Sequence, residues 1–312
     1  MALLKIYSDE NAAREHLESL NWPDGPICPH CGTVNEATKL AGKSTRPGVY
    51  KCRPCQKPFS VTVGTVFERS KIKLNVWVHA VDLYTASKKG FSAHQLHRTM
   101  GVTYKTAWFM AMRIREAMAP SKNVDPLGGE GKIIEADTTF VGGKEANKHR
   151  SKRDSKKIGG MGKQIVHTLV ERDGTARSHH IANISGATLR PILVSQVSRK
   201  SSLMTDTAGG YMSVGKEFER HEMVDHGIGE YVRGDAHSNT VEGYFSILKR
   251  GIYGVYHHVS EAHLKRYLAE FDFLYSYRVK LGYSDTMRAE EALKGIVGKR
   301  LMYRRPDEAE VS

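Results

Sequence analysis

The spacing of apolar and polar positions changes along the chain, and these changes divide it into segments. Residues 8–20 repeat apolar positions at helical spacing, and Ser8 stands where a helix N-cap is expected. From Leu74 to Ala117 the spacing is helical again. A linker over residues 120–131 is rich in Gly and Pro, and beyond it the pattern changes to that of strands. The sequence therefore predicts a helical N-terminal part followed by a part that contains a sheet.

The segments after the linker form an ordered series. Three strands, a helix and a fourth strand are expected in turn at residues 132–141, 164–170, 179–183, 187–197 and 202–205. Asp173-Gly174 marks a hairpin turn, and the chain after Asp206 reads as a long helical half. This order is that of an RNase H-like α/β fold. We therefore predict the α/β class with an RNase H-like, retroviral-integrase-like core.

The cysteines stand in two CxxC pairs near the N-terminus: Cys28, Cys31, Cys52 and Cys55. Paired spacing of this kind is typical of tetrahedral zinc sites, in which the ion replaces a hydrophobic core. Four unrelated thiols are the alternative, and two disulfides are disfavoured in a reducing compartment. The pattern predicts a zinc ribbon with Zn²⁺ in a structural role. Zinc ribbons bind proteins as readily as DNA, so the spacing leaves the partner open.

Residues 92–108 read as a helix, a glycine turn and a second helix. Gly101 would form the turn, and Thr103, Tyr104 and Lys105 would open the second helix, where side chains can reach base edges or phosphates. An ordinary helical hairpin is the alternative, because the motif is loose. We interpret the segment as a helix-turn-helix that supports DNA binding.

The charge balance narrows the class of partner. Lys and Arg outnumber Asp and Glu by 47 to 34, which gives a net charge of +13 and a pI of about 9.5. This excess favours polyanions, above all nucleic acid. No apolar run approaches the roughly 18 residues of a spanning helix, and the N-terminus turns polar too early for a signal peptide. We expect a cytoplasmic, nucleoid-associated protein with no membrane partner.

Two aspartates stand where an α/β site is expected. Asp137 lies within an apolar strand, where a charge is costly unless it is paired or binds metal. Asp206 ends another apolar strand, and α/β proteins place their sites at such ends. Glu135 shares a face with Asp137 because side chains alternate along a strand. Residues 144–157 (KEANKHRSKRDSKK) follow as a basic, solvated loop that either aids solubility or lies along a DNA backbone, and its place beside Asp137 favours DNA.

Residues 238–250 have helical periodicity, so their side chains can be assigned to faces at about 100° per residue. Asn239, Glu242 and Lys249 fall on one polar side. The neighbouring side is apolar and holds Val241, Tyr244, Phe245 and Leu248. We expect the apolar side to pack on the sheet and the polar side to face the aspartates. Carboxylates that hold two divalent ions about 4 Å apart suit phosphoryl transfer, and Lys249 would bind a nearby phosphate.

Several motifs together resemble bacterial insertion-sequence transposases of the DDE type that carry an N-terminal zinc ribbon, the ISXO-like family. The resemblance extends over nearly the whole chain, and it rests on WPDG at 22–25, CPHCG at 28–32, YKCRPC at 50–55, FS at 59–60, GTVF at 64–67, EADTTFVGGK at 135–144, Asp206 and HSNTVEGYFSILKRG at 237–251. It implies Asp137, Asp206 and Glu242 as the catalytic carboxylates, followed by Lys249. Some related enzymes are described with asparagine in the third role, so Asn239 is an alternative to Glu242. We favour Glu242 because a carboxylate binds magnesium better than an amide.

The resemblance also implies an activity and its partners. Asp137, Asp206 and Glu242 would hold Mg²⁺ or Mn²⁺, water would cut DNA at the ends of the element, and the freed 3′-hydroxyl would attack target DNA. Double-stranded DNA, at the terminal inverted repeats and in the target, would be the partner of a homo-oligomer. The expected divisions are a ribbon part, a helix-turn-helix part, a catalytic domain, and a C-terminal helix with its tail: residues 1–68, 69–120, 131–283 and 284–312. Two alternatives stay open, a catalytically inactive DNA-binding regulator and a nuclease that cleaves without joining.

Overall fold

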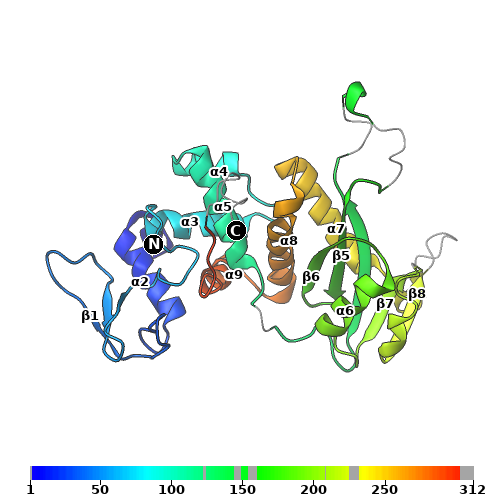
Figure 1. Cartoon of the computed structure of the whole chain (residues 1–312), viewed down its shortest axis with the longest axis horizontal. Coiled ribbons are helices and arrows are strands. Elements are labelled where there is room, and N and C mark those ends of the chain that lie inside the picture. Colours follow the sequence, from blue (N-terminus) through cyan, green and yellow to red (C-terminus); the bar gives the residue numbers. More distant parts are fainter. Residues whose placement is uncertain are drawn as a thin grey trace, which may run out of the picture. The chain divides into compact units, whose positions relative to one another are not determined.

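The computed structural model describes residues 2–121, 124–143, 149–153, 160–207, 209–224 and 232–302. The chain folds into two compact units (Figure 1). Residues 1–119 together with residues 284–312 form the first, here called the N-terminal unit. Residues 120–283 form the second, here called the sheet unit. Most of the basic segment 144–157 lies outside the described residues, which retain a 3₁₀ turn, η2 (Arg150–Lys152).

Helices dominate the N-terminal unit. They are α1 (Ala2–Ser8), α2 (Glu10–Asn21), α3 (Leu74–Ala86), α4 (Ala93–Met100), α5 (Tyr104–Met118) and α9 (Asp285–Lys294). The expected Ser8 cap is wrong, because Ser8 ends α1 and the side chain of Asp9 accepts hydrogen bonds from the first-turn amides of α2. An aspartate caps a helix as well as a serine does, so residue type does not distinguish these neighbours.

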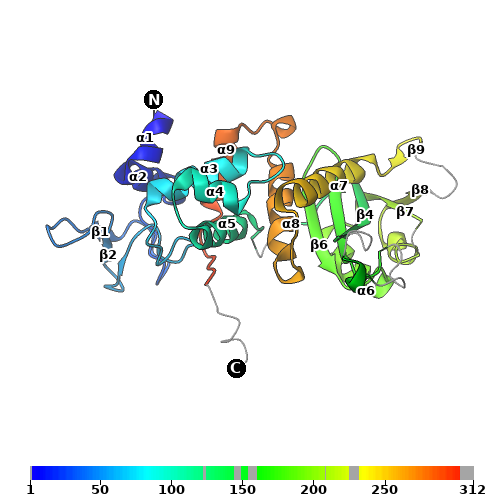
Figure 2. The ribbon, with the colours of Figure 1, turned by 90° about the horizontal axis from the view of Figure 1, so that it is seen from above.

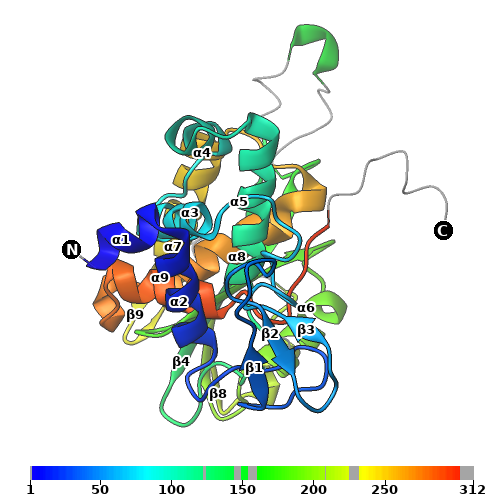
Figure 3. The ribbon, with the colours of Figure 1, turned by 90° about the vertical axis from the view of Figure 1, so that its left-hand side faces the viewer.

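The ribbon is a small antiparallel sheet in the order β1-β2-β3 (Figure 3). Its strands are β1 (Ala37–Lys39), β2 (Tyr50–Cys52) and β3 (Pro58–Phe59). Tyr50 packs against Trp22 and Phe59, and its hydroxyl donates to the Glu18 carboxylate on α2 at 2.9 Å. These aromatic rings form the ribbon's small core together with Cys28, Cys52 and Cys55.

Helices α4 and α5 are joined by a tight turn. Gly101 adopts a left-handed conformation, with φ of 64°, which glycine reaches without steric cost. Thr103 then caps α5 by accepting a hydrogen bond from the Thr106 amide. Tyr104, the first residue of α5, is exposed and stacks on His94 of α4 at 4.2 Å between ring centroids.

The C-terminal helix belongs to the N-terminal unit. α9 packs mainly on α3 and also contacts α2 and α5. Arg288 donates to the carbonyl of Thr85 at 2.8 Å, and Lys299 donates to that of Ala117 at 2.9 Å. Within the segment expected to be separate, residues 284–299 therefore complete the core of the first part of the chain.

The sheet unit contains a mixed five-stranded sheet in the order β6-β5-β4-β7-β8. The strands are β4 (Ile133–Val141), β5 (Gln164–Glu171), β6 (Ala176–Ile181), β7 (Ser202–Asp206) and β8 (Arg220–Val224). The first three pair antiparallel, and β7 and β8 run parallel to β4. All four predicted strands are present, although the third covers residues 176–181 instead of 179–183. The expectation of a helical chain after Asp206 is wrong. β8 escaped prediction because its residues, RHEMV, are mostly polar and lie at a sheet edge.

Helices cover both faces of this sheet (Figure 2). They are α6 (Gly186–Gln196), α7 (Asn239–Gly251) and α8 (Glu261–Ser276), with the short elements β9 (Val232–Arg233), β10 (Ala236–His237), η3 (Val214–Glu217), η5 (Ile252–Tyr256) and η6 (Val279–Leu281). α6 packs on one face and α7 and α8 pack on the other. Ile134 and Ala136 of β4 face α6, whereas Val141 faces α7. By alternation, Glu135 and Asp137 therefore lie on the α7 side.

Among the described residues, no helix combines the length and the apolar composition that a membrane crossing needs.

Candidate active site and metal centre

The register of two central strands places the two aspartates side by side. β4 and β7 are parallel neighbours in which Ile134 pairs with Leu203 and Ala136 pairs with Thr205. The next positions along this register are Asp137 and Asp206. Neighbouring strands lie about 4.8 Å apart, and both aspartates point to the α7 face because side chains alternate. Asp137 and Asp206, which are far apart in sequence, are thus neighbours on adjacent strands of the sheet.

Helix α7 adds further polar groups on the same face. Its apolar side is buried as expected, with Val241, Tyr244, Phe245 and Leu248 packed against the sheet. Its polar side borders a pocket of about 350 Å³. The pocket is lined by Asp137, Thr138, Thr139, Glu242, Phe245, Ser246 and Lys249. The pocket therefore joins one aspartate of the sheet to the glutamate and lysine of the helix.

The electrostatics of Asp137 reflect this crowding. Burial, together with the charges of Asp206 and Glu242, raises the pKa of Asp137 from 3.8 to about 7. The Thr138 amide, which donates to Asp137 Oδ1 at 2.6 Å, and Lys249 act in the opposite direction. A carboxylate held among other carboxylates is stabilised by a bound cation, which removes the repulsion.

Two sequence-predicted residues lie outside the pocket lining. Asp206 acts on Asp137 through its charge, and Asn239 is the exposed first residue of α7, one turn before Glu242. Among the described residues, the ligand atoms of Asp137, Asp206 and Glu242 do not converge as a tight group of metal ligands. They share a face and an electrostatic environment.

The role of Glu135 was not predicted from the sequence. Its side chain is fully buried and accepts hydrogen bonds from Thr240, Val241 and Arg172. Its carboxylate therefore joins β4 to the first turn of α7. The one signal in the sequence is a charge in an apolar strand, on the same face as Asp137, but its partners on α7 are more than a hundred residues away in the chain.

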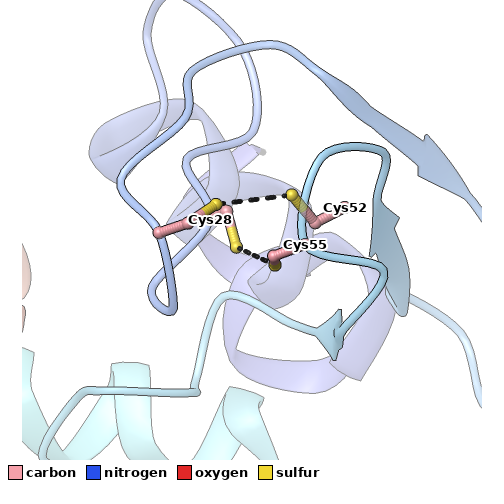
Figure 4. A group of neighbouring side chains, drawn as sticks. Cys28, Cys52 and Cys55 are labelled. Carbon is pink, nitrogen blue, oxygen red and sulfur yellow. Dashed lines mark hydrogen bonds between the residues drawn. The ribbon is translucent and has the colours of Figure 1, made fainter.

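The four cysteines form a second candidate site (Figure 4). Their Sγ atoms all lie within 4.8 Å of one another, with 3.7 Å between Cys28 and Cys55 and 3.6 Å between Cys31 and Cys52. These separations exclude disulfide bonds, and they match the sulfur–sulfur edge of about 3.8 Å expected for tetrahedral zinc with Zn–S of about 2.3 Å. The donor set and its geometry fit one structural zinc ion.

Local backbone conformation brings the thiols together. Gly32 and Gln56, each just after one CxxC pair, take positive φ of 78° and 58° and turn the chain back. Hydrogen bonds from the hydroxyl and the amide of Thr33 lower the pKa of Cys31 to about 6, with the hydroxyl 3.2 Å from Sγ. This favours the thiolate that binds metal.

Comparison with known families fits both sites. Residues 126–276 match the model of the ISXO2-like transposase domain, and residues 8–58 match that of the transposase zinc-ribbon domain. The chain is therefore similar to a transposase zinc ribbon over residues 8–58 and to an ISXO2-like transposase domain over residues 126–276. The transposase domain implies an RNase H-like core, and the zinc-ribbon domain contains all four clustered cysteines. The resemblance seen in the sequence motifs is thereby confirmed.

A full-length relative agrees with these matches. It is named "Uncharacterized protein in transposable element ISH50" and comes from Halobacterium salinarum. The two chains are 29% identical over 287 residues, which cover 87% of this chain and 92% of the relative. The similarity therefore spans the segment between the two matched regions as well as parts of both.

Proposed function

We propose that this protein is a DNA transposase that binds the terminal inverted repeats of its element and catalyses metal-dependent cleavage and strand transfer. The observation that carries this proposal is the adjacency of Asp137 and Asp206 in the β4–β7 register, on the face where α7 presents Glu242 and Lys249. The site lies within the ISXO2-like transposase domain.

Asp137, Asp206 and Glu242 are the proposed ligands of Mg²⁺ or Mn²⁺. They offer hard carboxylate oxygens, and the raised pKa of Asp137 indicates a site where a cation is favoured. Bound there, divalent ions would activate the attacking oxygen and neutralise charge on the leaving oxygen. Asn239 is the alternative third ligand, but the pocket lining includes Glu242 and not Asn239.

The chain's own residues orient the DNA. Lys249 lines the pocket, and its ammonium group would bind a phosphate next to the scissile bond. Water would first break a P–O3′ bond at the element's end. The freed 3′-hydroxyl would then attack a target phosphodiester, so that one bond forms as another breaks and no external energy source is needed.

DNA recognition is assigned to the N-terminal unit. The zinc ribbon would hold its shape through Cys28, Cys31, Cys52 and Cys55, and α4–α5 would act as a helix-turn-helix. Tyr104 and Lys105 open α5, where such motifs contact DNA, and Tyr104 is exposed. The protein would act as a homo-oligomer on paired ends.

A strand-transfer assay tests the proposal. Purified protein is mixed with labelled DNA carrying the element's ends, a target plasmid and Mg²⁺, beside Asp137→Ala. Asp173→Asn is a matched control, because Asp173 is an exposed aspartate on the β5–β6 turn of the same unit. Its carboxylate forms an ion pair with Lys280. We expect joined products from the wild type and the control, and none from Asp137→Ala. Binding of the ends with neither cleavage nor joining would indicate the inactive regulator, and cleavage alone would indicate a nuclease.

A further inference from the structure

The N-terminus of α7 is capped by a residue from the sheet. The Glu135 Oε2 atom accepts hydrogen bonds from the backbone amides of Thr240, at 2.8 Å, and Val241, at 3.0 Å. Its Oε1 atom accepts from the Thr240 hydroxyl at 2.8 Å. Ser238, the residue at the N-cap position, makes no side-chain capping bond. A buried carboxylate on β4 thus satisfies amides that a local cap usually satisfies.

Arg172 holds the same carboxylate from the other side. Its Nε donates to Glu135 Oε1 at 2.6 Å, and its Nη atoms donate to the carbonyls of Asp235, at 2.8 Å, and His237, at 3.0 Å. These carbonyls belong to the segment that leads into α7. Arg172 also donates to His237 Nδ1 at 3.0 Å. One anion, one cation and the positive end of a helix therefore form a single hydrogen-bonded cluster.

This cluster adjoins the candidate active site at two places, on β4 next to Asp137 and on α7 next to Glu242. Glu135 is two residues before Asp137 and points to the same face of β4. Val241 is the residue before Glu242. The side chain of Glu135 therefore links the strand that carries Asp137 directly to the helix that carries Glu242.

We propose that Glu135 is a positioning residue for the divalent metal site. By fixing the first turn of α7 on β4, it sets the distance of Glu242 and Lys249 from Asp137 and Asp206, and thereby the affinity of these carboxylates for metal. The inference rests on the proposed function, which places the metal there. The described partners of Glu135 are all residues of the cluster, so its proposed role acts through α7.

Two substitutions of Glu135 test its role: one removes the charge of the side chain and the other shortens it. Glu135→Gln keeps the length of the side chain but presents an amide NH₂ to a set of donors. Glu135→Asp keeps the charge but is too short by one methylene group to hold the Thr240 and Val241 amides and Arg172 together. Both should let α7 shift at its N-terminus. Glu171→Gln is the matched control, since Glu171 lies on the adjacent strand β5 and bonds Gly128 and Lys132 instead of α7.

The test is a Mn²⁺ titration of the full-length, zinc-loaded protein without DNA, followed by electron paramagnetic resonance. We expect Glu135→Gln and Glu135→Asp to weaken Mn²⁺ binding on the order of tenfold or more, the usual effect of losing a group that orients a ligand. Glu171→Gln should bind as the wild type does, and Asp137→Asn should abolish the site. The Mn²⁺ concentration for half-maximal DNA cleavage should rise by the same factor as the dissociation constant.

Folded Glu135 variants with wild-type Mn²⁺ affinity would overturn the proposal. If both variants fail to fold, Thr240→Val decides, because it removes only the 2.8 Å hydroxyl contact and keeps the amide. Weaker Mn²⁺ binding at an unchanged melting temperature then supports the positioning role, and unchanged binding refutes it. A wild type that binds Mn²⁺ but neither cleaves nor joins DNA refutes the proposed function alone. A wild type without a Mn²⁺ site refutes both.

Discussion

Glu135 and Asp137 are two carboxylates on one face of one strand, yet their surroundings differ. Glu135 is surrounded by donors, including a guanidinium group and two helix amides. Asp137 accepts one amide hydrogen bond and lies near two other carboxylates. Hydrogen bonds to a charged form stabilise it, whereas like charges and burial destabilise it. The environment therefore makes one residue structural and leaves the other suited to binding a cation.

The raised pKa of Asp137 predicts a pH-dependent gain in stability for Asp137→Asn without added divalent ions. The folded-state pKa of about 7 exceeds the usual 3.8, so the stability present below pH 3.8 is lost as pH rises through 7. At pH 8 the asparagine variant should be more stable than the wild type by up to about 4 kcal/mol, and at pH 4 the difference should vanish. Urea unfolding at the two pH values measures this.

Asp173→Asn provides the contrast for that experiment. The hydrogen bond from Lys280 lowers the pKa of Asp173, so its charge is favoured in the folded state. This variant should gain no stability at pH 8. An Asp137→Asn protein that is destabilised equally at both pH values would show that Asp137 is not held in a repulsive environment.

At the scale of elements, one half-buried aspartate joins β6, α7 and α8. Asp272 of α8 accepts hydrogen bonds from the Ser178 amide at 2.8 Å, the Ser178 hydroxyl at 2.7 Å and the Tyr244 hydroxyl at 2.5 Å. Burial raises the pKa of Asp272 to about 6 although these three donors oppose it. The packing of α7 on the sheet therefore depends on this network as well as on its apolar side.

Removing one donor from this network should destabilise the sheet unit. Tyr244→Phe leaves the half-buried Asp272 carboxylate with one hydrogen bond fewer, which costs about 1–3 kcal/mol at pH 7.5. The cost should shrink at pH 5, because a carboxyl group with a raised pKa is protonated there and needs fewer donors. Denaturant midpoints at both pH values test this. Tyr253→Phe is the control, since Tyr253 is exposed, and a loss as large as that of Tyr244→Phe would contradict the argument.

The zinc ribbon has only a small core, so we expect a bound zinc ion to supply much of its stability. We expect one zinc ion per chain, and we expect Cys31→Ser to lose it and to unfold β1–β3, because metal binding and folding are coupled in such modules. Thr33→Val should keep the ion at pH 7.5 but release it at a higher pH than the wild type on acidification, since it lacks the hydroxyl that lowers the Cys31 pKa. A chromophoric chelator measures zinc release. Full zinc retention by Cys31→Ser would contradict the four-thiol site.

The features of this fold that depend on local sequence patterns could be predicted, whereas those that depend on contacts between distant residues could not. The CxxC spacing, the alternation of β4 and the helical period of α7 each depend on residues that are close in sequence, so a reading of the sequence alone can find them. β8 was missed because an edge strand needs no apolar alternation. The cap of α7 was missed because Glu135 and Thr240 meet only in the folded chain, and no local signal identifies such a pair.

At the scale of the whole molecule, the two ends of the described chain build one unit. The buried residues of α9 include Ala292 and Leu293, and α9 packs on α3. Beyond the helix, the Val66 amide donates to the carbonyl of Ile296 at 3.2 Å, and the Gly298 amide donates to that of Gly64 at 2.9 Å. The N-terminal unit, which holds the zinc ribbon, therefore depends on residues that are synthesised after the sheet unit.

Removal of residues 284–312 should consequently destabilise the N-terminal unit and spare the sheet unit. Without α9 the apolar surface of α3 would be exposed, and Arg288 would no longer bond to Thr85. Differential scanning calorimetry should show the loss of one transition in the shortened protein, and binding to DNA ends should weaken with it. Removal of residues 303–312 alone is the matched control, because α9 and the residues that bond to Val66, Gly64 and Ala117 all precede them. If the protein without residues 284–312 kept both transitions and its zinc, α9 would be dispensable to the unit, and the dependence of the ribbon-bearing unit on the end of the chain would be refuted.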